Sequence, residues 1–301
     1  MVDHELTGAF APVVTPFHAD MTPDAPRFVA HCEWLLSHGV GLAPFGTNSE
    51  ANSLDTRERM TLLDHLVERG LDVRRMLPGT GCCSLPETVA LTRHALGHGC
   101  AGVLMLPPFF YKGITDDGLY DYYARVIEQV GDTRLRVYLY HIPALSGVPI
   151  TLPVIERLIR DFPQTVVGIK DSSGDWNNLN AMLDAFPGFG IFPASESLVS
   201  RASAKGAKGC ISATVNVNPQ VIGRLCREWA GDEGAALQAQ ADAVRSIVQS
   251  FPMIPALKAV LATHRDDLSW QRVRAPLSQL TGDQHARLHA QLAACGFTLP
   301  G

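Results

Sequence analysis

Short apolar runs alternate with longer segments of helical periodicity along the first two-thirds of the chain. The runs are rich in Val, Ile, Leu and Phe, and each intervening segment is long enough to form a helix. Because strands covered by helices on both faces are apolar almost throughout, this order predicts parallel strands joined by helical crossovers. Eight strands are predicted, over residues 9–17, 40–45, 76–81, 102–106, 136–140, 166–170, 190–193 and 209–212.

The helical segments between the runs support this order. Residues 57–70 place Met60, Leu63 and Val67 on one side of a helix, and residues 85–99 end in glycine, a common residue after a helix. Eight strands, each followed by a helix, are typical of an α/β fold of the closed (β/α)8 TIM barrel type. An open doubly wound sheet is the alternative.

The first predicted strand and the end of the chain refine this prediction. Thr15-Pro16-Phe17 stands where a dinucleotide-binding sheet carries GxGxxG, which disfavours a nucleotide-binding open sheet. Beyond about Pro219 the strand pattern stops, and helix-like segments follow, among them residues 234–250 and 284–295. We therefore expect a barrel over residues 1–218 with C-terminal helices over 219–301 packed on it as one structural unit.

Composition excludes several classes of function. The 301 residues carry a net charge of -5 without a basic run, so no footprint for nucleic acid or an anionic membrane is present. No run approaches the roughly 18 apolar residues that span a bilayer. Seven cysteines fit neither a disulfide framework nor a CxxC zinc pattern, which indicates a reducing, cytoplasmic location. A small molecule is the expected partner.

Lys170 is the most informative position in the chain. It is one of only five lysines and ends the run Val166-Val167-Gly168-Ile169-Lys170, whose alternation places residues 166, 168 and 170 on one face. Chemistry in a barrel gathers at the C-terminal ends of the strands. A desolvated, neutral lysine there can attack a ketone and form a Schiff base. A lysine that caps the strand and extends to solvent is the alternative.

Tyr140 ends the preceding predicted strand, in Val137-Tyr138-Leu139-Tyr140. If the two strands are neighbours, the phenol lies beside Lys170 and can relay protons during imine formation. An amphipathic tyrosine with its ring packed and its hydroxyl in water is equally compatible with the sequence.

Gly46-Thr47-Asn48-Ser49-Glu50 follows the second predicted strand. Its backbone N–H groups and small polar side chains can bind a carboxylate, although an ordinary helix N-cap at Asn48 or Ser49 explains the same residues.

Two histidine pairs, His94 with His98 and His285 with His289, have the i, i+4 spacing of metal ligands. Because neither pair brings a convincing third ligand and HExxH is absent, no metal site is predicted.

Seven motifs in order give the chain a resemblance to a known family. It resembles the dihydrodipicolinate synthase and N-acetylneuraminate lyase family of class I, Schiff-base-forming (β/α)8 enzymes, and the likeness covers nearly the whole chain. The motifs are VVTPF, GTNSE, PGTG, LMLPPFFYKG, YLYHIPALSG, VVGIKDSSGD and GCISATVNV.

The resemblance implies a role for each site residue. Lys170 matches the imine-forming lysine and Tyr140 the proton-relay phenol, with Thr47 beside it in the catalytic relay. Thr47 and Asn48 match the positions that bind the carboxylate of a 2-keto acid, and Ile211 matches a backbone contact near the imine. No metal and no separate cofactor are implied, because the substrate bonds covalently to the lysine.

Two positions depart from the synthases of this family. Phe110 stands where a neighbouring subunit's tyrosine completes the relay, so water, Tyr111 or His141 would have to replace it. Leu145 stands where an arginine binds the carboxylate of aspartate semialdehyde, and Leu145 cannot bind a carboxylate. Losing that contact costs on the order of 2 kcal/mol, so lysine biosynthesis is not the first expectation. Phe110 and Leu145 indicate a less polar distal part of the substrate site.

GTNSE, KDSSGD and VRAPLSQL are more similar to the 4-hydroxy-2-oxoglutarate and 2-keto-3-deoxy sugar acid aldolase branches. The expected activity is reversible retro-aldol cleavage of a 2-keto-4-hydroxy acid to pyruvate and an aldehyde. The alternatives are 4-hydroxy-tetrahydrodipicolinate synthase, a 2-keto-3-deoxy sugar acid dehydratase, and a keto-acid-binding barrel without catalysis. The family implies a homotetramer, built as a dimer of dimers, with the loop that carries Phe110 near the tight dimer interface.

Overall fold

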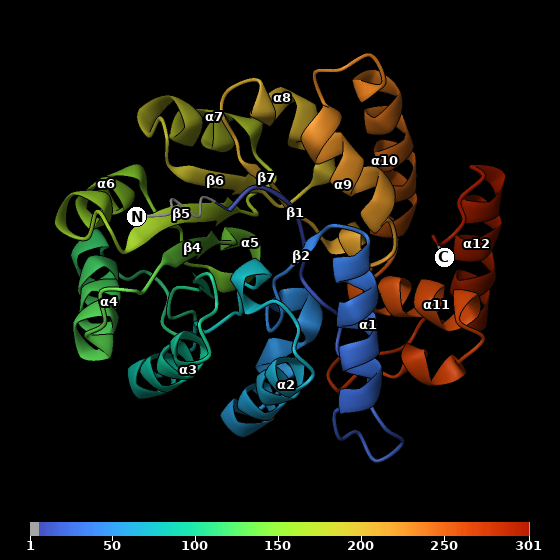
Figure 1. Cartoon of the computed structure of the whole chain (residues 1–301), viewed down its shortest axis with the longest axis horizontal. Coiled ribbons are helices and arrows are strands. Elements are labelled where there is room, and N and C mark those ends of the chain that lie inside the picture. The colour runs from blue at the N-terminus through green and yellow to red at the C-terminus, as the bar shows by residue number, and fades with distance from the viewer. Residues whose placement is uncertain (1–5, 301) are drawn as a thin grey trace.

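The computed structural model describes residues 6–300, and its strands form a ring surrounded by helices (Figure 1). The TIM barrel predicted from the alternating runs is confirmed by this ring of parallel strands (Figure 1). The strands are β1 Gly8–Ala11, β2 Gly41–Leu42, β3 Val103–Met105, β4 Val137–His141, β5 Val166–Asp171, β6 Gly190–Pro193 and β7 Gly209–Ile211.

All strand pairs within the described residues are parallel, in the orders β2-β1-β7 and β3-β4-β5-β6. The third predicted strand, residues 76–81, is bridged to its neighbours at Met76 with Leu42 and at Gly79 with Leu104. Backbone N–H groups of Leu77, Gly79 and Thr80 donate to the adjacent segments. Pro78 has no N–H to donate, and a Cβ at Gly79 would lie 2.1 Å from the Phe45 carbonyl oxygen. Residues 76–81 thus close one gap between the two sheets without a continuous ladder.

The pairing of β4 with β5 sets the position of the lysine. The register places Tyr140 opposite Lys170 but shifts by one residue between Val137 and Tyr138. Because of this shift, Val166 packs outward in the core between strands and helices, and the prediction that it shares a face with Lys170 was wrong. Gly168 faces inward, where a Cβ would lie 2.3 Å from the Tyr138 ring.

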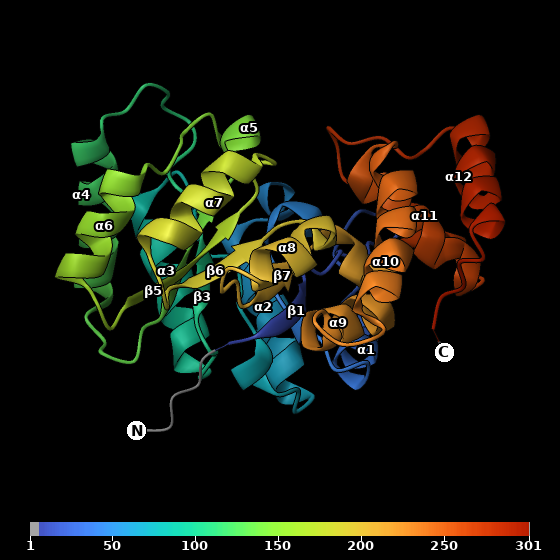
Figure 2. The ribbon, with the colours of Figure 1, turned by 90° about the horizontal axis from the view of Figure 1, so that it is seen from above.

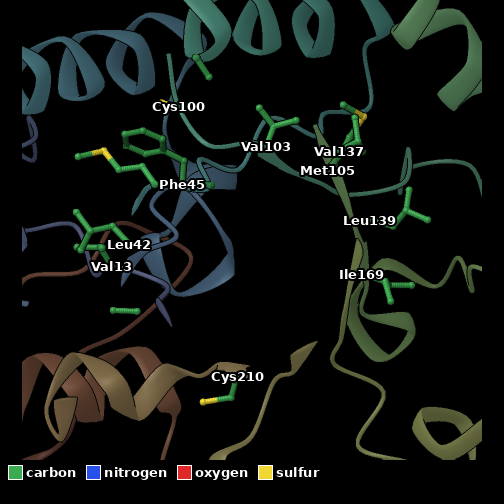
Figure 3. Close-up of a cluster of buried hydrophobic side chains, with 14 of the residues drawn as sticks. Val13, Leu42, Phe45, Cys100, Val103, Met105, Val137, Leu139, Ile169 and Cys210 are labelled. Atoms are coloured by element: carbon green, nitrogen blue, oxygen red, sulfur yellow. The ribbon is translucent and has the colours of Figure 1, made fainter. Parts of the chain in front are cut away.

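Two apolar clusters lie on the two sides of the ring. The inner cluster fills the barrel with Phe10, Ala43, Leu77, Leu104, Tyr138, Tyr140, Phe192 and Ile211. The outer cluster joins the strands to the helices, and Figure 3 shows its members on β3, β4 and β5, among them Met105, Leu139 and Ile169. The barrel is therefore a packed core that opens only at its mouth.

The helices of the described residues surround this core. Their bounds are α1 Ala25–Ser37, α2 Thr56–Glu68, α3 Leu85–Gly97, α4 Asp116–Val130, α5 Pro143–Ser146, α6 Leu152–Asp161, α7 Trp176–Ala185, α8 Val199–Ser203, α9 Pro219–Glu228, α10 Gly234–Gln249, α11 Met253–His264 and α12 Gly282–Ala294.

Helix α2 turns a different face to the core from the one predicted. It begins with a capping box between Asp55 and Glu58, and its buried residues are Arg59, Leu62, Leu63 and Leu66. Leu63 is buried as predicted, but Met60 and Val67 are only partly covered. Arg59 can be buried because its guanidinium donates a hydrogen bond to the Ala51 carbonyl oxygen. The spacing of apolar residues does not predict this contact.

The C-terminal helices form a layer on one side of the ring. In Figures 1 and 2, α11 and α12 lie beyond α1 and α9, away from α4 and α6. A separate apolar cluster joins α10, α11 and α12. The division of the chain after residue 218 remains a prediction.

Among residues 6–300, no single helix is long and apolar enough to cross a membrane. Helices α10 and α11 pass the length and composition test only as a pair, and they meet at a bend of 111°.

Candidate active site

A cavity of about 380 Å³ opens at the carboxyl ends of the strands. Residues that follow β2, β4, β5, β6 and β7 line it, together with α10 and the segment that begins α11. Lys170, Tyr140, Thr47, Asn48, Ile211 and Leu145, six of the predicted site residues, are among the lining residues. The barrel thus brings together side chains from positions 47 to 211 at its mouth.

Lys170 and Tyr140 are neighbours on adjacent strands. Both are buried, with exposed fractions of 2%, and the Lys170 Nζ lies 4.3 Å from the centroid of the Tyr140 ring. Within the described residues, no carboxylate lies within ion-pair distance of Nζ. The Lys170 amine is therefore not engaged in an ion pair, and it borders the cavity.

The loop after β2 brings Thr47 to the phenol. Thr47 Oγ1 and Tyr140 Oη are 3.0 Å apart, within hydrogen-bond distance. Two non-glycine residues with left-handed backbone, Phe45 (φ 63°) and Glu50 (φ 57°), bracket the loop. Such conformations persist only where the surroundings impose them, and they concentrate at functional sites.

A buried ion pair imposes the conformation at Glu50. The Lys258 Nζ on α11 contacts the Glu50 carboxylate and donates to the Arg272 carbonyl oxygen at 2.6 Å. The backbone N–H of Arg274 donates to the other Glu50 oxygen at 2.8 Å. Burial lowers the pKa of Lys258 to about 8, and the neighbouring Glu50 opposes that shift. Hydrophobic patterning does not predict this anchor, although a single lysine within the apolar segment MIPALKAVLA is a sign of it.

The positions expected to bind substrate differ in exposure. Ile211 is buried on the inner face of the barrel, and Leu145 lines the cavity with 67% of its surface exposed. Phe110 is 71% exposed and does not line the cavity of the single chain. Lys112 ties its loop to the segment after β4, because Nζ donates to the carbonyl oxygens of Phe109 and Ser146.

Neither expected substitute for the relay tyrosine faces the cavity. Tyr111 is 74% exposed and stacks edge-on with Phe110. His141 is buried, and its Nδ1 accepts a hydrogen bond from the Ile150 N–H at 3.0 Å. Burial lowers the pKa of His141, which favours a neutral ring with the proton on Nε2. Among the described residues predicted for the relay, only Tyr140 and Thr47 line the cavity and contact each other.

Three further residues at the cavity were not predicted. Asp171 follows Lys170, and burial raises its pKa, while hydrogen bonds from Ser173 and Asn178 fix its carboxylate. The Ser172 Oγ is buried and has no hydrogen-bond partner within the described residues. Arg245 reaches the cavity from α10. Asp171 and Ser172 stand inside the KDSSGD motif, whereas Arg245 lies in a helix that sequence patterning marks only as amphipathic.

The first histidine pair does have a third neighbour. The Nε2 atoms of His94 and His98 lie 2.9 and 2.7 Å from the same Asp64 oxygen, so the expectation that no third group accompanies the pair was wrong. At these distances, the two rings can each donate a hydrogen bond to one carboxylate oxygen, which accounts for the arrangement. The second pair, His285 and His289, contacts Thr263.

Comparisons with known proteins identify the family of the chain. Residues 5–295 match the model of the dihydrodipicolinate synthetase family. An uncharacterized DapA-like lyase from Chloroflexus aurantiacus is 34% identical over 289 residues, which cover 95% of this chain and 96% of that relative.

Two solved structures share the fold over nearly their whole length. Dihydrodipicolinate synthase from Agrobacterium tumefaciens is 27% identical with a TM-score of 0.90, covering 96% of this chain and 99% of that one. A prophage protein of the dihydrodipicolinic acid synthase family from E. coli, solved with pyruvate, is 27% identical with a TM-score of 0.87, covering 97% and 99%. The match runs from end to end, so the chain belongs to the dihydrodipicolinate synthetase family and is a lyase.

Proposed function

We propose that the protein is a class I, pyruvate-dependent aldolase that cleaves a 2-keto-4-hydroxy acid reversibly to pyruvate and an aldehyde. One observation carries the proposal: the Lys170 amine is buried in a cavity without a carboxylate partner among residues 6–300, beneath a phenol that contacts Thr47. The pyruvate bound to the E. coli relative supports a keto acid as the ligand. No metal or separate cofactor takes part in the proposed reaction.

Binding places the keto group at the amine. The substrate carboxylate binds at Thr47 and Asn48, where a hydroxyl and backbone N–H groups converge after β2. The Lys170 nitrogen attacks C2, and the phenol of Tyr140 supplies and removes the protons as the carbinolamine loses water to give an imine. Thr47 orients the Tyr140 hydroxyl and connects it to the mouth of the cavity.

The imine makes the carbon–carbon bond breakable. When Tyr140 removes the proton from the C4 hydroxyl, the electron pair of the C3–C4 bond moves toward the protonated imine, and an aldehyde leaves. A proton then adds to C3 of the remaining enamine. Water hydrolyses the imine and releases pyruvate, which restores Lys170. The reverse sequence joins pyruvate to an aldehyde.

Two other lyase reactions use the same imine. A dehydratase expels the hydroxyl of a 2-keto-3-deoxy sugar acid instead of breaking the carbon–carbon bond. The 4-hydroxy-tetrahydrodipicolinate synthase reaction, suggested by the name of a relative from Nitratidesulfovibrio vulgaris, condenses pyruvate with aspartate semialdehyde. Leu145 disfavours the synthase, because its side chain at the rim offers no charge to the semialdehyde carboxylate.

Borohydride trapping tests the proposal. Incubation with pyruvate and borohydride should add one reduced pyruvyl group to the peptide that contains Lys170. The peptide that contains Lys258 is an internal control, because that buried lysine contacts Glu50 and lies outside the cavity. An unmodified Lys170 peptide would refute the imine.

Turnover separates the lyases from a barrel that only binds. Release of pyruvate from 2-keto-3-deoxy acids, or its consumption with an aldehyde panel, identifies an aldolase. Trapping without either reaction identifies the keto-acid-binding alternative. We include in the proposal a cytoplasmic homotetramer with the exposed Phe110 and Tyr111 near a subunit interface, which sedimentation tests.

A further inference from the structure

Three potential metal ligands from two neighbouring helices meet on the outer side of the barrel. Asp64 lies on α2, and His94 and His98 lie one turn apart at the end of α3, which packs beside α2 (Figure 1). The Nε2 atoms of the two histidines lie 2.9 and 2.7 Å from the same Asp64 oxygen, and the three atoms lie within 4.8 Å of one another. Among residues 6–300, no other three histidine, cysteine or acidic side chains bring their ligand atoms together in this way.

The spacing of these atoms is close to that of ligands around one metal ion. Zinc bonds to imidazole nitrogen and carboxylate oxygen at about 2.0 to 2.2 Å, so its ligand atoms lie roughly 3.0 to 3.4 Å apart. The side chains have room to adjust, because their exposed fractions are 23% for His94, 27% for His98 and 40% for Asp64. Hydrogen bonds to Asp64 hold the two rings in position without a metal, and this preorganises the ligands.

The charges around the three side chains favour a cation. No lysine or arginine within residues 6–300 forms an ion pair with Asp64, whose carboxylate faces the two imidazoles. His98 follows the last residue of α3, where the backbone carbonyl groups give the helix end a partial negative charge. The carbonyl oxygen of Met60 adds a further acceptor, 3.3 Å from the His94 Nε2 atom.

We propose that Asp64, His94 and His98 bind one divalent transition-metal ion, with Zn²⁺ as its representative. Imidazole nitrogens favour such ions over Mg²⁺ and Ca²⁺, which prefer sites made of oxygen ligands. Three protein ligands leave at least one coordination position for water. None of the three residues lines the cavity at Lys170, so the metal site is independent of the proposed aldolase reaction.

The metal joins α2 to α3 and stabilises this side of the barrel. The chain between the two helices includes residues 76–81, which lie outside a regular strand ladder. At a free metal concentration of about 100 times Kd, binding shifts the folding equilibrium about 100-fold toward the folded protein. In a protein of this size, Tm should therefore rise by roughly 4 °C.

Titration of the full chain, prepared without a polyhistidine tag, tests the proposal. Calorimetry should give one Zn²⁺ per chain. Co²⁺ should produce the visible absorption of a site with nitrogen and oxygen ligands, without a charge-transfer band from a cysteine thiolate. Asp64→Asn and His94→Gln should each weaken Zn²⁺ binding by about 100-fold or more, because even an outer-shell partner of a metal contributes about 10- to 100-fold.

The second histidine pair supplies a matched control. His285 and His289 have the same spacing, with ring centroids 4.3 Å apart compared with 4.7 Å in the first pair. They contact the Thr263 hydroxyl instead of a carboxylate. A double variant, His285→Gln with His289→Gln, should therefore retain both the Zn²⁺ affinity and the metal-dependent rise in Tm.

The outcomes separate a metal site from a hydrogen-bonded cluster. Zn²⁺ affinity that Asp64→Asn leaves unchanged, or that only the His285 and His289 variant loses, contradicts the proposal. A native protein whose Tm does not respond to Zn²⁺, while Asp64→Asn lowers Tm without metal, assigns the three residues to hydrogen bonding alone and also contradicts it. Circular dichroism shows that each variant is folded. The pyruvate adduct on Lys170 tests only the aldolase proposal.

Discussion

Two buried lysines of this chain differ in one respect, the presence of a counter-ion. Lys170 at the end of β5 and Lys258 on α11 are both almost fully buried. Each Nζ lies over an aromatic ring, 4.3 Å from the centroid of Tyr140 and 4.5 Å from that of Phe17. Lys258 also contacts a carboxylate and a backbone carbonyl oxygen, whereas Lys170 borders the cavity and has no ion-pair partner among the described residues.

Under the proposed function, this difference separates the lysine that reacts with the substrate from a lysine that stabilises the fold. An amine paired with Glu50 is held in the charged form and cannot attack a carbonyl carbon, and its removal leaves a buried carboxylate unpaired. Lys170 has no such partner among the described residues, and in the proposed reaction its amine attacks the keto group. Burial alone does not identify a catalytic lysine. Its partners and its access to a cavity do.

The largest expected effect is on turnover, at Lys170. Lys170→Met should reduce turnover by roughly 10³-fold or more, because no imine can form, while thermal unfolding stays close to that of the native protein. Steady-state kinetics and calorimetry measure the two effects. Lys205→Met is a control, since this exposed lysine pairs with Asp184 and should retain turnover. Full activity in Lys170→Met would break the comparison.

The opposite pattern is expected at Lys258. Lys258→Met should destabilise the fold by about 3 to 5 kcal/mol, because Glu50 is left charged and buried. Denaturant unfolding measures this change. Lys258→Met combined with Glu50→Gln should recover part of the stability, since the charge is removed as well. A single variant as stable as the native protein would show that the pair does not anchor the loop.

A third buried basic side chain, His31, should make the stability of the fold depend on pH. Burial, reinforced by the nearby Arg265, lowers its pKa to about 3. Its Nε2 can donate to Asn216 while Nδ1 accepts from Arg265, so the folded protein holds it neutral.

Between pH 6.5 and 3, the unfolded chain binds a proton at His31 that the folded protein does not, so stability falls as the pH falls through this window. At about 1.4 kcal/mol per pKa unit, the loss over this window is on the order of 5 kcal/mol. Unfolding free energies from pH 7 to 4 should show the decline, and His31→Gln should flatten it. An equally steep decline in the variant would assign it to other groups.

The smallest of these effects concerns the phenol above Lys170. Tyr140→Phe should lower turnover by about 10²-fold, which is what a positioned proton donor contributes, while pyruvate can still be trapped slowly on Lys170. Thr47→Val, which keeps the shape but removes the hydroxyl that contacts the phenol, should lower turnover less. Unchanged rates in Tyr140→Phe would remove the phenol from the relay.

Local patterns predicted the barrel because the strands of a closed parallel sheet are apolar on both faces. The hydrophobic pattern did not predict strand pairing and side-chain direction where the backbone of single residues determines them. Pro78 and Gly79 keep residues 76–81 out of a regular ladder, and the register shift at Val137 reverses the direction of Val166. The interrupted pairing and the register shift leave the hydrophobic periodicity unchanged. The periodicity therefore could not predict either of them.

The candidate site was predictable where a residue ends a strand. Lys170 and Tyr140 follow from strand ends, and their adjacency follows from the strand order that the register confirms. Arg245 and Lys258 were missed because their positions depend on contacts between elements far apart in sequence. A charged residue in an otherwise apolar helix was the only local sign of Lys258.

The backbone of residues 272–274, which contacts Lys258 and Glu50, has a consequence for synthesis of the protein. The loop that presents Thr47 is held by Glu50, and Glu50 is held by Lys258 and by the backbone N–H of Arg274. During translation, the first strands leave the ribosome more than two hundred residues before this segment. A nascent chain can therefore assemble much of its barrel while the keto-acid site still lacks its final shape, and activity begins only when almost the whole polypeptide has emerged.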